Sequence, residues 1–289
     1  MAYSLPRVAL ETTLLLHGVP AADALPLFDS LVATVKANGA HPRALGLFDG
    51  QPVDGLTRCQ LEAMLAGPAV SKTNTATLGA LMAKRAHGAT TVSTTMELAA
   101  SRGIRLFATG GIGGAHKQWA THGDISADLA ALARFPVAVV TSGCKSILDV
   151  LATREMLETL GVPVIGYQTS RFPAFYQRDG GCDVDARFDD AEQLGRYCAH
   201  ELARTGRGIV IASPVPEAEE LAPEQFALWL SQAEEHAAAR GAVGRAVTPI
   251  VLGALHQLSG GATLRANIAL VQRNCEVAAQ VAVHTERMD

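Results

Sequence analysis

Short runs of apolar residues alternate along the chain with longer stretches whose apolar positions recur every three to four residues. The short runs are rich in β-branched residues, as buried strands are, whereas the longer stretches are typical of amphipathic helices. The short runs predict strands at about 7–16, 43–48, 89–94, 104–109, 137–142, 162–168 and 208–213. The longer stretches predict helices at about 22–37, 58–66, 76–87, 95–102, 126–134, 145–160, 222–240, 247–258 and 263–283. This alternation indicates an α/β fold, with a mixed or largely parallel sheet that helices cover on both faces.

We expect residues 1–289 to form a single domain, because no internal repeat and no linker rich in Pro, Gly or Ser divides the chain. The segment 171–190 is the least regular part, and its pattern predicts a long polar loop that is a candidate lid. No segment reaches eighteen uninterrupted apolar residues, and no apolar stretch follows a basic start. The sequence therefore predicts neither a membrane span nor a signal peptide.

Composition narrows the classes of function. Of the 289 residues, 48% are hydrophobic and 18% are charged, with a formal net charge of −4, which argues against a nucleic-acid-binding or membrane-anchored protein. The five cysteines are an odd number at irregular spacing, as in a reduced cytoplasmic protein. Only five of the 24 cationic residues are lysines, namely Lys36, Lys72, Lys84, Lys117 and Lys145. Each lysine is therefore a candidate for chemistry that arginine cannot perform.

Glu11 lies within an apolar strand pattern, which leaves two interpretations open. Its side chain either points to solvent from an edge strand or lies at a buried face of the sheet. In the second case desolvation raises the pKa of the carboxyl, so that it holds a proton near neutral pH and can donate it. The neighbouring Thr12, Thr13 and His17 add polar groups to the same segment.

Lys145 follows the apolar run 137–142 at the predicted opening of a helix. Open α/β sheets build their sites beyond the carboxyl ends of strands, so this is a favourable place for chemistry. The positive end of a helix dipole disfavours an ammonium ion, and an amine that is neutral there can attack a carbonyl or an anomeric carbon. A solvated lysine at a helix terminus is the alternative.

Three further features are candidates for binding phosphate or a metal ion. Gly110, Gly111, Gly113 and Gly114 follow a predicted strand, as phosphate-binding loops do, but the dinucleotide-binding spacing is not met. Asp124 and Ser126 are either simple helix caps or part of a site for a hydrated divalent ion. Lys72 precedes a turn rich in Thr and Asn, and it is either a solvated lysine or a point charge for a phosphate.

Several motifs resemble those of one family, the pseudouridine-5′-phosphate glycosidases, over nearly the whole chain. They include VALETTLLLHGVP at 8–20, FATGGIGGAHK at 107–117, SGCKSILD at 142–149 and the long segment 247–274. The resemblance implies an α/β/α arrangement around a mixed sheet, assembly as a homotrimer and dependence on Mn²⁺ or another divalent cation. It also implies reversible cleavage of the carbon–carbon bond that joins the base of a C-nucleoside 5′-phosphate to ribose 5-phosphate, with pseudouridine 5′-phosphate as the substrate and uracil as the base.

The resemblance also implies roles for individual residues. Lys145 resembles the nucleophile that forms an imine with the ring-opened sugar, Glu11 the proton donor and Asp124 the metal ligand. Positions that resemble substrate-contacting ones are Lys72, Val92, Thr109, His116, Ser126, Ala127, Asp128 and Asn267. A lysine nucleophile suits the chemistry, because a carbon leaving group needs an adjacent electron sink that two carboxylates alone do not supply.

Departures from the family pattern leave other functions open. Where the family has a Ser-Arg-Arg-Asp run after the first substrate-binding lysine, this chain has Asn74, Thr75, Ala76 and Thr77. A biosynthetic C-glycosynthase that joins ribose 5-phosphate to a different heterocycle, such as a hydroxypyridone, is therefore the alternative. An imine-forming sugar-phosphate aldolase and an inactive binding module are further possibilities, although retention of both Glu11 and Lys145 argues against the latter.

Overall fold

The computed structural model describes residues 5–117, 119–241 and 247–285. Its main sheet has ten strands in the order β13-β10-β14-β8-β6-β1-β2-β5-β4, and β3 pairs with β2 outside this path. Every pair is parallel except β2 with β3 and β2 with β5. These strands are β1 (Arg7–Leu10), β2 (His41–Phe48), β3 (Gln51–Asp54), β4 (Ser71–Thr73), β5 (Gly88–Thr90), β6 (Leu106–Ala108), β8 (Ala138–Thr141), β10 (Val164–Tyr167), β13 (Ala186–Phe188) and β14 (Ile209–Ala212). The prediction of a mixed, largely parallel sheet is confirmed.

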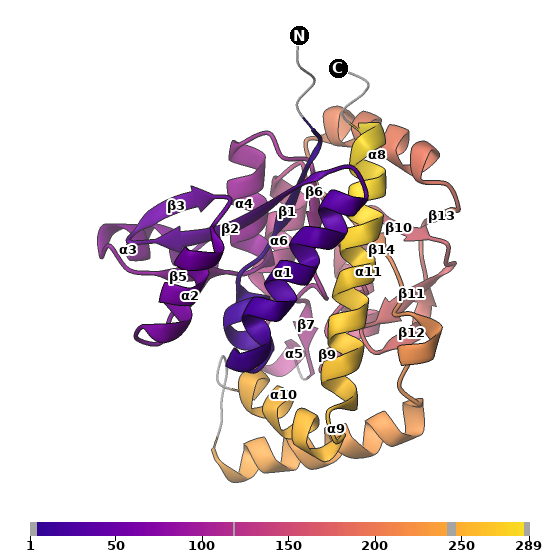
Figure 1. The fold of residues 1–289 in the computed structure, drawn as a ribbon. Coiled ribbons are helices and arrows are strands. Elements are labelled where there is room, and N and C mark those ends of the chain that lie inside the picture. The colour runs from indigo at the N-terminus through magenta and orange to yellow at the C-terminus, as the bar shows by residue number, and fades with distance from the viewer. Residues whose placement is uncertain (1–4, 118, 242–246, 286–289) are drawn as a thin grey trace.

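Helices cover both faces of this sheet (Figure 1). Helices α1 and α11 pack on one face, and α4 packs on the other face together with α6. The helices are α1 (Ala21–Ala37), α2 (Arg58–Ala66), α3 (Leu78–Ala83), α4 (Val92–Ser101), α5 (Trp119–His122), α6 (Ala127–Arg134), α7 (Val150–Thr159), α8 (Ala191–Thr205), α9 (Pro223–Ala239), α10 (Val247–Leu258) and α11 (Ala262–Thr285). The predicted three-layer α/β/α arrangement is confirmed. Among the described residues, no helix is both long enough and apolar enough to span a bilayer.

The central strands are short and buried along their whole length, so the core lies on both sides of the sheet. Every residue of strands β8, β10 and β14 is buried. Burial of about 25 cal/mol for each Å² of apolar surface makes these runs the main stabilising element of the fold. Because the strands run in parallel, the carboxyl ends of β8, β6 and β1 lie next to one another at one edge of the sheet.

Several predicted elements differ from the structure. The predicted strand 89–94 ends at Thr90, and α4 begins at Val92. The predicted helix 145–160 begins only at Val150.

Two larger differences concern residues 7–16 and 171–190. The predicted strand 7–16 ends at Leu10, and residues Leu14–Gly18 form a π-helical turn, η1. The amide N–H of Leu16 donates to the carbonyl of Thr12 at 3.0 Å, so the apolar run continues as a turn that packs on α1 and α10. The predicted polar loop 171–190 is also wrong, because it contains an antiparallel hairpin of β11 (Arg171–Ala174) and β12 (Gln177–Asp183) followed by the edge strand β13.

Helix α11 joins the sheet to the site. Asn274, buried in this helix, donates through Nδ2 to the carbonyl of Thr109 at 2.7 Å and to the hydroxyl of Ser142 at 3.2 Å. These partners follow β6 and β8 directly. Asn267 lies two helical turns earlier, on the same side of α11. The helix therefore fixes the ends of two strands and presents a polar side chain next to them.

Candidate active site

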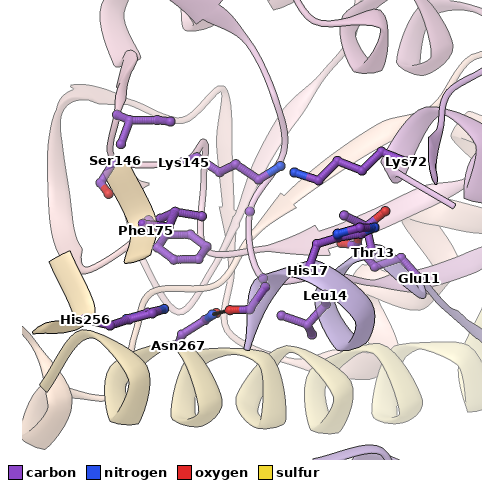
Figure 2. A pocket seen from close by; sticks show the side chains of 15 residues that line it. Glu11, Thr13, Leu14, His17, Lys72, Lys145, Ser146, Phe175, His256 and Asn267 are labelled. Atoms are coloured by element: carbon purple, nitrogen blue, oxygen red, sulfur yellow. Dashed lines mark hydrogen bonds between the residues drawn. The ribbon is translucent and has the colours of Figure 1, made fainter. Parts of the chain in front are cut away.

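A cavity lies at the carboxyl ends of the central strands, on the edge of the sheet that the α/β pattern indicated. It occupies about 650 Å³, including its open mouth. Figure 2 shows its lining residues, which come from β4, η1, α10, α11, the hairpin β11–β12 and the loops after β1, β6 and β8. They are Glu11, Thr13, Leu14, His17, Gly18, Lys72, Gly110, Gly111, Lys145, Ser146, Ile147, Phe175, Leu252, His256 and Asn267.

Glu11 directly follows β1, which lies between β6 and β2 in the interior of the sheet. The interpretation as a solvated edge residue is therefore wrong, and the carboxyl is 8% exposed within the cavity. Burial raises the pKa of Glu11, while the Lys145 ammonium and the hydrogen bond from the Thr109 hydroxyl to Oε1 act in the opposite direction. Because Thr109 donates to Oε1, Oε2 is the oxygen left to carry a proton.

Lys145 lies in the loop after β8. Its amide N–H donates to the carbonyl of Ile112 at 3.0 Å, and its carbonyl accepts from the amide of Leu148 at 3.0 Å, so the backbone is held on both sides. Helix α7 begins only at Val150, after the Asp149 cap. The expected position at a helix terminus is therefore wrong, and this amine does not lie at the positive end of a helix dipole.

The side chains of Lys72 and Lys145 point toward each other across the cavity (Figure 2). Lys72 lies in the middle of β4. Burial lowers the pKa of Lys72 and the nearby Lys145 ammonium lowers it further, whereas the Glu11 carboxylate raises it. Two amines and one carboxyl thus face the same cavity.

The glycines of the segment 110–114 allow neighbouring side chains to pack closely against its backbone. A Cβ atom on Gly111 would lie 2.5 Å from the ring of Phe175, and one on Gly113 would lie 2.2 Å from Oγ of Ser126. The Asp128 carboxylate accepts from the amide of Ser93 at 2.9 Å and from the amide of Gly113 at 2.8 Å, so it ties this segment to α4. Gly110 and Gly111 line the cavity, and Gly113 supports it from outside.

The structure brings together some of the predicted site residues and leaves others outside the cavity lining. Glu11, Lys72, Lys145 and Asn267 line the cavity, and Thr109 contacts it through Glu11. The remaining candidates surround the glycine-rich segment: Val92 begins α4, Ser126 caps α6 through the amide of Asp128, and His116 pairs with Leu148 between β7 (Ala115–His116) and β9 (Leu148–Asp149), while Asp124, Ala127 and Asp128 lie in the adjoining residues 124–128.

Asp124 and His116 are the residues that could hold a divalent ion. Nδ1 of His116 lies 3.9 Å from Oδ2 of Asp124, whose side chain is 49% exposed. No group of three or more His, Cys, Asp or Glu side chains with metal-binding geometry occurs among the residues that the structure describes. The pair fits a hydrated ion that keeps most of its water, since carboxylate and water oxygens suit Mg²⁺ and Mn²⁺, and it does not fit a closed protein cage.

Sequence reasoning did not assign roles to several cavity residues. His17 belongs to a turn that the sequence predicts as a strand, and Phe175 to a hairpin that it predicts as a loop. His256, in α10, forms a 2.8 Å hydrogen bond through Nδ1 with the hydroxyl of Thr263, and burial lowers the pKa of this histidine. Phe175 has a φ of 62°, a strained conformation for a bulky residue that often marks a functional site. Only the His17-Gly18 pair beside Glu11 gave a signal in the sequence.

Comparisons with known proteins agree with this geometry. Residues 1–284 match the family model described as indigoidine synthase A like protein. The pseudouridine-5′-phosphate glycosidase of Methylobacterium nodulans is 45% identical over 279 residues, covering 96% of this chain and 83% of that protein. The glycosidase of the same name from Chloroflexus aurantiacus is 45% identical over 288 residues, covering 97% and 94%.

Two solved structures are also similar. An indigoidine synthase A (IdgA)-like protein from Thermotoga maritima superposes with a TM-score of 0.89 at 33% identity, covering 96% of this chain and 92% of that one. The prealnumycin C-glycosynthase AlnA, in complex with ribulose 5-phosphate, superposes with a TM-score of 0.90 at 31% identity, covering 98% and 92%. This chain belongs to the indigoidine synthase A like family, and pseudouridine-5′-phosphate glycosidases are among its relatives.

Proposed function

We propose that the protein is an enzyme that reversibly breaks or forms the carbon–carbon bond between C1′ of ribose 5-phosphate and a heterocyclic base, with pseudouridine 5′-phosphate as the substrate. The observation that carries this proposal is the meeting of Lys145 and a buried Glu11 in one cavity at the carboxyl ends of the central strands. The names of the relatives, which are 45% identical over nearly the whole chain, point to the same substrate.

The reaction follows from the roles of these two side chains. The Lys145 amine forms a bond to C1′ while the bond from C1′ to the ring oxygen breaks, and Glu11 gives that oxygen its proton. The electron pair on the lysine nitrogen then forms a carbon–nitrogen double bond as the bond between C1′ and the base breaks. The base carbon takes a proton, and water hydrolyses the imine to release ribose 5-phosphate. The lysine nitrogen thus supplies the electron pair that expels the carbon leaving group, which a carboxylate does not do.

Other residues bind and orient the substrate in this proposal. Lys72 provides a cation for the sugar or its phosphate. Phe175, Leu252 and Ile147 form an apolar part of the cavity that suits a planar base. A divalent ion such as Mn²⁺, held by Asp124 with His116 beside it, would neutralise phosphate charge when bound.

A biosynthetic role with another heterocycle is the second candidate. The amides of Asn74 and Thr77 each donate to the other residue's side chain at 3.1 Å, so these side chains stabilise the turn before α3. Thr75 and Ala76, which stand between them, provide no charge where the family pattern has two arginines. The similarity to a C-glycosynthase of 31% identity favours the same alternative, in which a hydroxypyridone-like ring replaces uracil.

A lysine substitution tests the proposed chemistry. We expect the wild-type protein to convert pseudouridine 5′-phosphate to uracil and ribose 5-phosphate, and borohydride to trap ribose 5-phosphate on Lys145, as mass spectrometry would show. The Lys145→Arg variant should lose at least about 10³-fold in kcat/KM, because a guanidinium cannot form the imine.

The exposed Lys84 offers the matched control, since Lys84→Arg should keep full activity. Turnover by Lys145→Arg within tenfold of the wild type would refute the imine. Product formation with a hydroxypyridone and ribose 5-phosphate, but not with uracil, would establish the biosynthetic alternative. Cleavage of the sugar to a shorter aldehyde would establish an aldolase.

We also propose that the chain assembles as a homotrimer and acts in the cytoplasm. Support for both comes from the family resemblance, and the odd number of cysteines agrees with a reducing compartment. Light scattering coupled to size-exclusion chromatography should give three times the monomer mass of 30.2 kDa, and a monomeric mass would contradict the assembly.

A further inference from the structure

His17 is a cavity residue for which the proposed reaction has so far no role. It lies in the π-helical turn η1, six residues after Glu11. Such turns are rare and occur often at functional sites. The turn is held at its start, where the hydroxyl of Thr13 donates to the carbonyl of Ala89 at 3.1 Å. Figure 2 shows the ring on the same side of the cavity as Glu11 and Lys72.

One ring nitrogen of His17 has no partner. Its Nε2 atom is buried and makes no hydrogen bond to any residue that the structure describes. A buried polar atom without a partner costs about 1–3 kcal/mol, so such an atom in a cavity is expected to meet a ligand group. Asn267 has a second unpartnered atom, Oδ1, in the same cavity.

The surroundings of His17 define what this nitrogen can bind. Burial lowers the pKa of the ring, and the Lys72 ammonium lowers it further, against a backbone hydrogen bond to Val70. In a neutral imidazole one nitrogen donates and the other accepts, and a hydroxyl group of a ligand can do either. Nε2 can therefore pair with a hydroxyl group in both tautomers.

The position of His17 distinguishes the sugar from the base. Glu11 and Lys72 lie at its end of the cavity, whereas Phe175 and His256 lie at the other end (Figure 2). The Glu11 carboxyl must reach the ring oxygen of the sugar in the proposed reaction, so this end receives the sugar. We propose that Nε2 of His17 forms a hydrogen bond with a hydroxyl group of the phosphorylated sugar. This inference rests on the proposed function and adds a substrate-binding residue to it.

The test combines a substitution with the removal of single hydroxyl groups. The readout is the rate at which borohydride traps ribose 5-phosphate, or its 2-, 3- or 4-deoxy analogue, on Lys145. We expect His17→Leu to lower the rate with ribose 5-phosphate about 10- to 100-fold, and His17→Gln to restore part of it, since its terminal amide can also form a hydrogen bond near the position of Nε2.

The analogues separate a contact from a structural effect. With one of the deoxy analogues, the trapping rate of the wild type should fall by the same factor as the His17→Leu substitution causes with ribose 5-phosphate. The trapping rate of His17→Leu should be the same with that analogue as with ribose 5-phosphate. Equal losses in the wild type and in His17→Leu with all three analogues would overturn the inference. His200→Leu, on the exposed side of α8, is the control and should match the wild type.

A failure of the proposed function would look different. In that case the wild type would form no trapped adduct with ribose 5-phosphate. The inference would then be tested by calorimetric titration of ribose 5-phosphate. Weaker binding to His17→Leu than to the wild type would support the contact, and equal affinity or absent binding to the wild type would overturn it.

Discussion

Glu11 has a raised pKa because of its position, and the proposed proton donor requires a raised pKa. Burial raises the pKa, and the opposing contributions come from Lys145, Thr109 and Lys72. The hydroxyl of Thr109 also donates to one carboxyl oxygen, which leaves the other to carry the proton in the proposed reaction. The same burial makes the charged form of this carboxyl costly to the fold.

The pH dependence of activity should show this acid. Because Glu11 must be protonated, we expect kcat/KM of the wild type to fall as the pH rises through the raised pKa of Glu11. Glu11→Gln should lower kcat/KM about 10²- to 10⁴-fold and remove this alkaline decline. Rate profiles from about pH 5 to about pH 9 measure both effects. If kcat/KM of Glu11→Gln fell at high pH as that of the wild type does, a group other than Glu11 would be responsible for the fall.

Glu11→Gln, which should lower the activity, should raise the stability of the fold at high pH. The pKa of Glu11 is raised in the folded state, so the folded protein binds this proton more tightly than the unfolded chain. Its stability therefore falls as the pH rises from the unfolded pKa through the folded one. We therefore expect Glu11→Gln to be more stable than the wild type above the folded pKa, because the amide cannot ionise. Urea unfolding in acid, where the difference should vanish, provides the comparison.

Asp124 gives a prediction for the metal. If a hydrated divalent ion binds there, chelation with EDTA should raise KM for the phosphorylated substrate, and added Mn²⁺ should restore it. Asp124→Asn should show the raised KM without chelator and should not respond to Mn²⁺, because a neutral amide is a weaker ligand. An Mn²⁺ response in Asp124→Asn that equals the wild-type response would place the ion elsewhere.

At the scale of elements, the loop that carries Lys145 is fixed by the hairpin β11–β12. Gly143 has a φ of +77°, and a Cβ atom there would lie 1.7 Å from the carbonyl oxygen of Pro173. The amide N–H of Phe175 donates to the carbonyl of Ser142 at 2.8 Å. The hairpin thus holds the loop and places the Phe175 ring over Gly111.

Gly143→Ala should disrupt the contact between the loop that carries Lys145 and the hairpin β11–β12. We expect a loss of about 2–4 kcal/mol in the free energy of unfolding, because both the backbone conformation and the close approach exclude a side chain. The catalytic rate should fall with it, as Lys145 is two residues away. Gly253→Ala, on the exposed side of α10 where a Cβ atom meets nothing within 4 Å, should be neutral or slightly stabilising. A comparable loss in both variants would exclude the close contact as the cause.

The sequence predicts those elements best that local pattern alone determines. Strands β8, β10 and β14 are apolar runs buried on both faces, and their predicted ranges agree within about two residues. The end of β1 was not predictable in this way, because Leu14, Leu15 and Leu16 continue the apolar run after the strand has ended. Helix α8 has no predicted counterpart, although Asp190 caps it and Gly206, with a φ of 66°, ends it.

The site was predictable where a residue type carries its own chemistry. Glu11, Lys72 and Lys145 stood out as charged residues at strand ends or beside polar turns, and the structure brings them together. Phe175 could not be found, because its place depends on a hairpin whose sequence is polar. The position of Lys145 was predicted correctly for an incorrect reason, since α7 begins only at Val150 and its cap is Asp149.

For the whole molecule, the cavity is assembled from segments far apart in the chain, from η1 near the start to α11 near the end. A ligand that contacts all of them should stabilise the entire fold. At 100 times its Kd, ribose 5-phosphate should contribute about 2.7 kcal/mol and raise Tm by several degrees. Lys72→Gln should reduce this increase, whereas Lys84→Arg should keep it. Equal shifts in wild type and Lys72→Gln, measured by calorimetry, would contradict a role for Lys72 in binding.

The amines of Lys72 and Lys145, which face each other in the cavity, can also be used to measure whether the site is occupied. Two of its five lysines lie in one cavity, and Lys36 and Lys84 lie on helix surfaces. An amine-reactive label followed by peptide mass spectrometry would therefore yield only a handful of modified sites. Protection of the two cavity lysines relative to the two surface lysines would give the fraction of molecules with an occupied site, for any candidate substrate and without an assay for turnover.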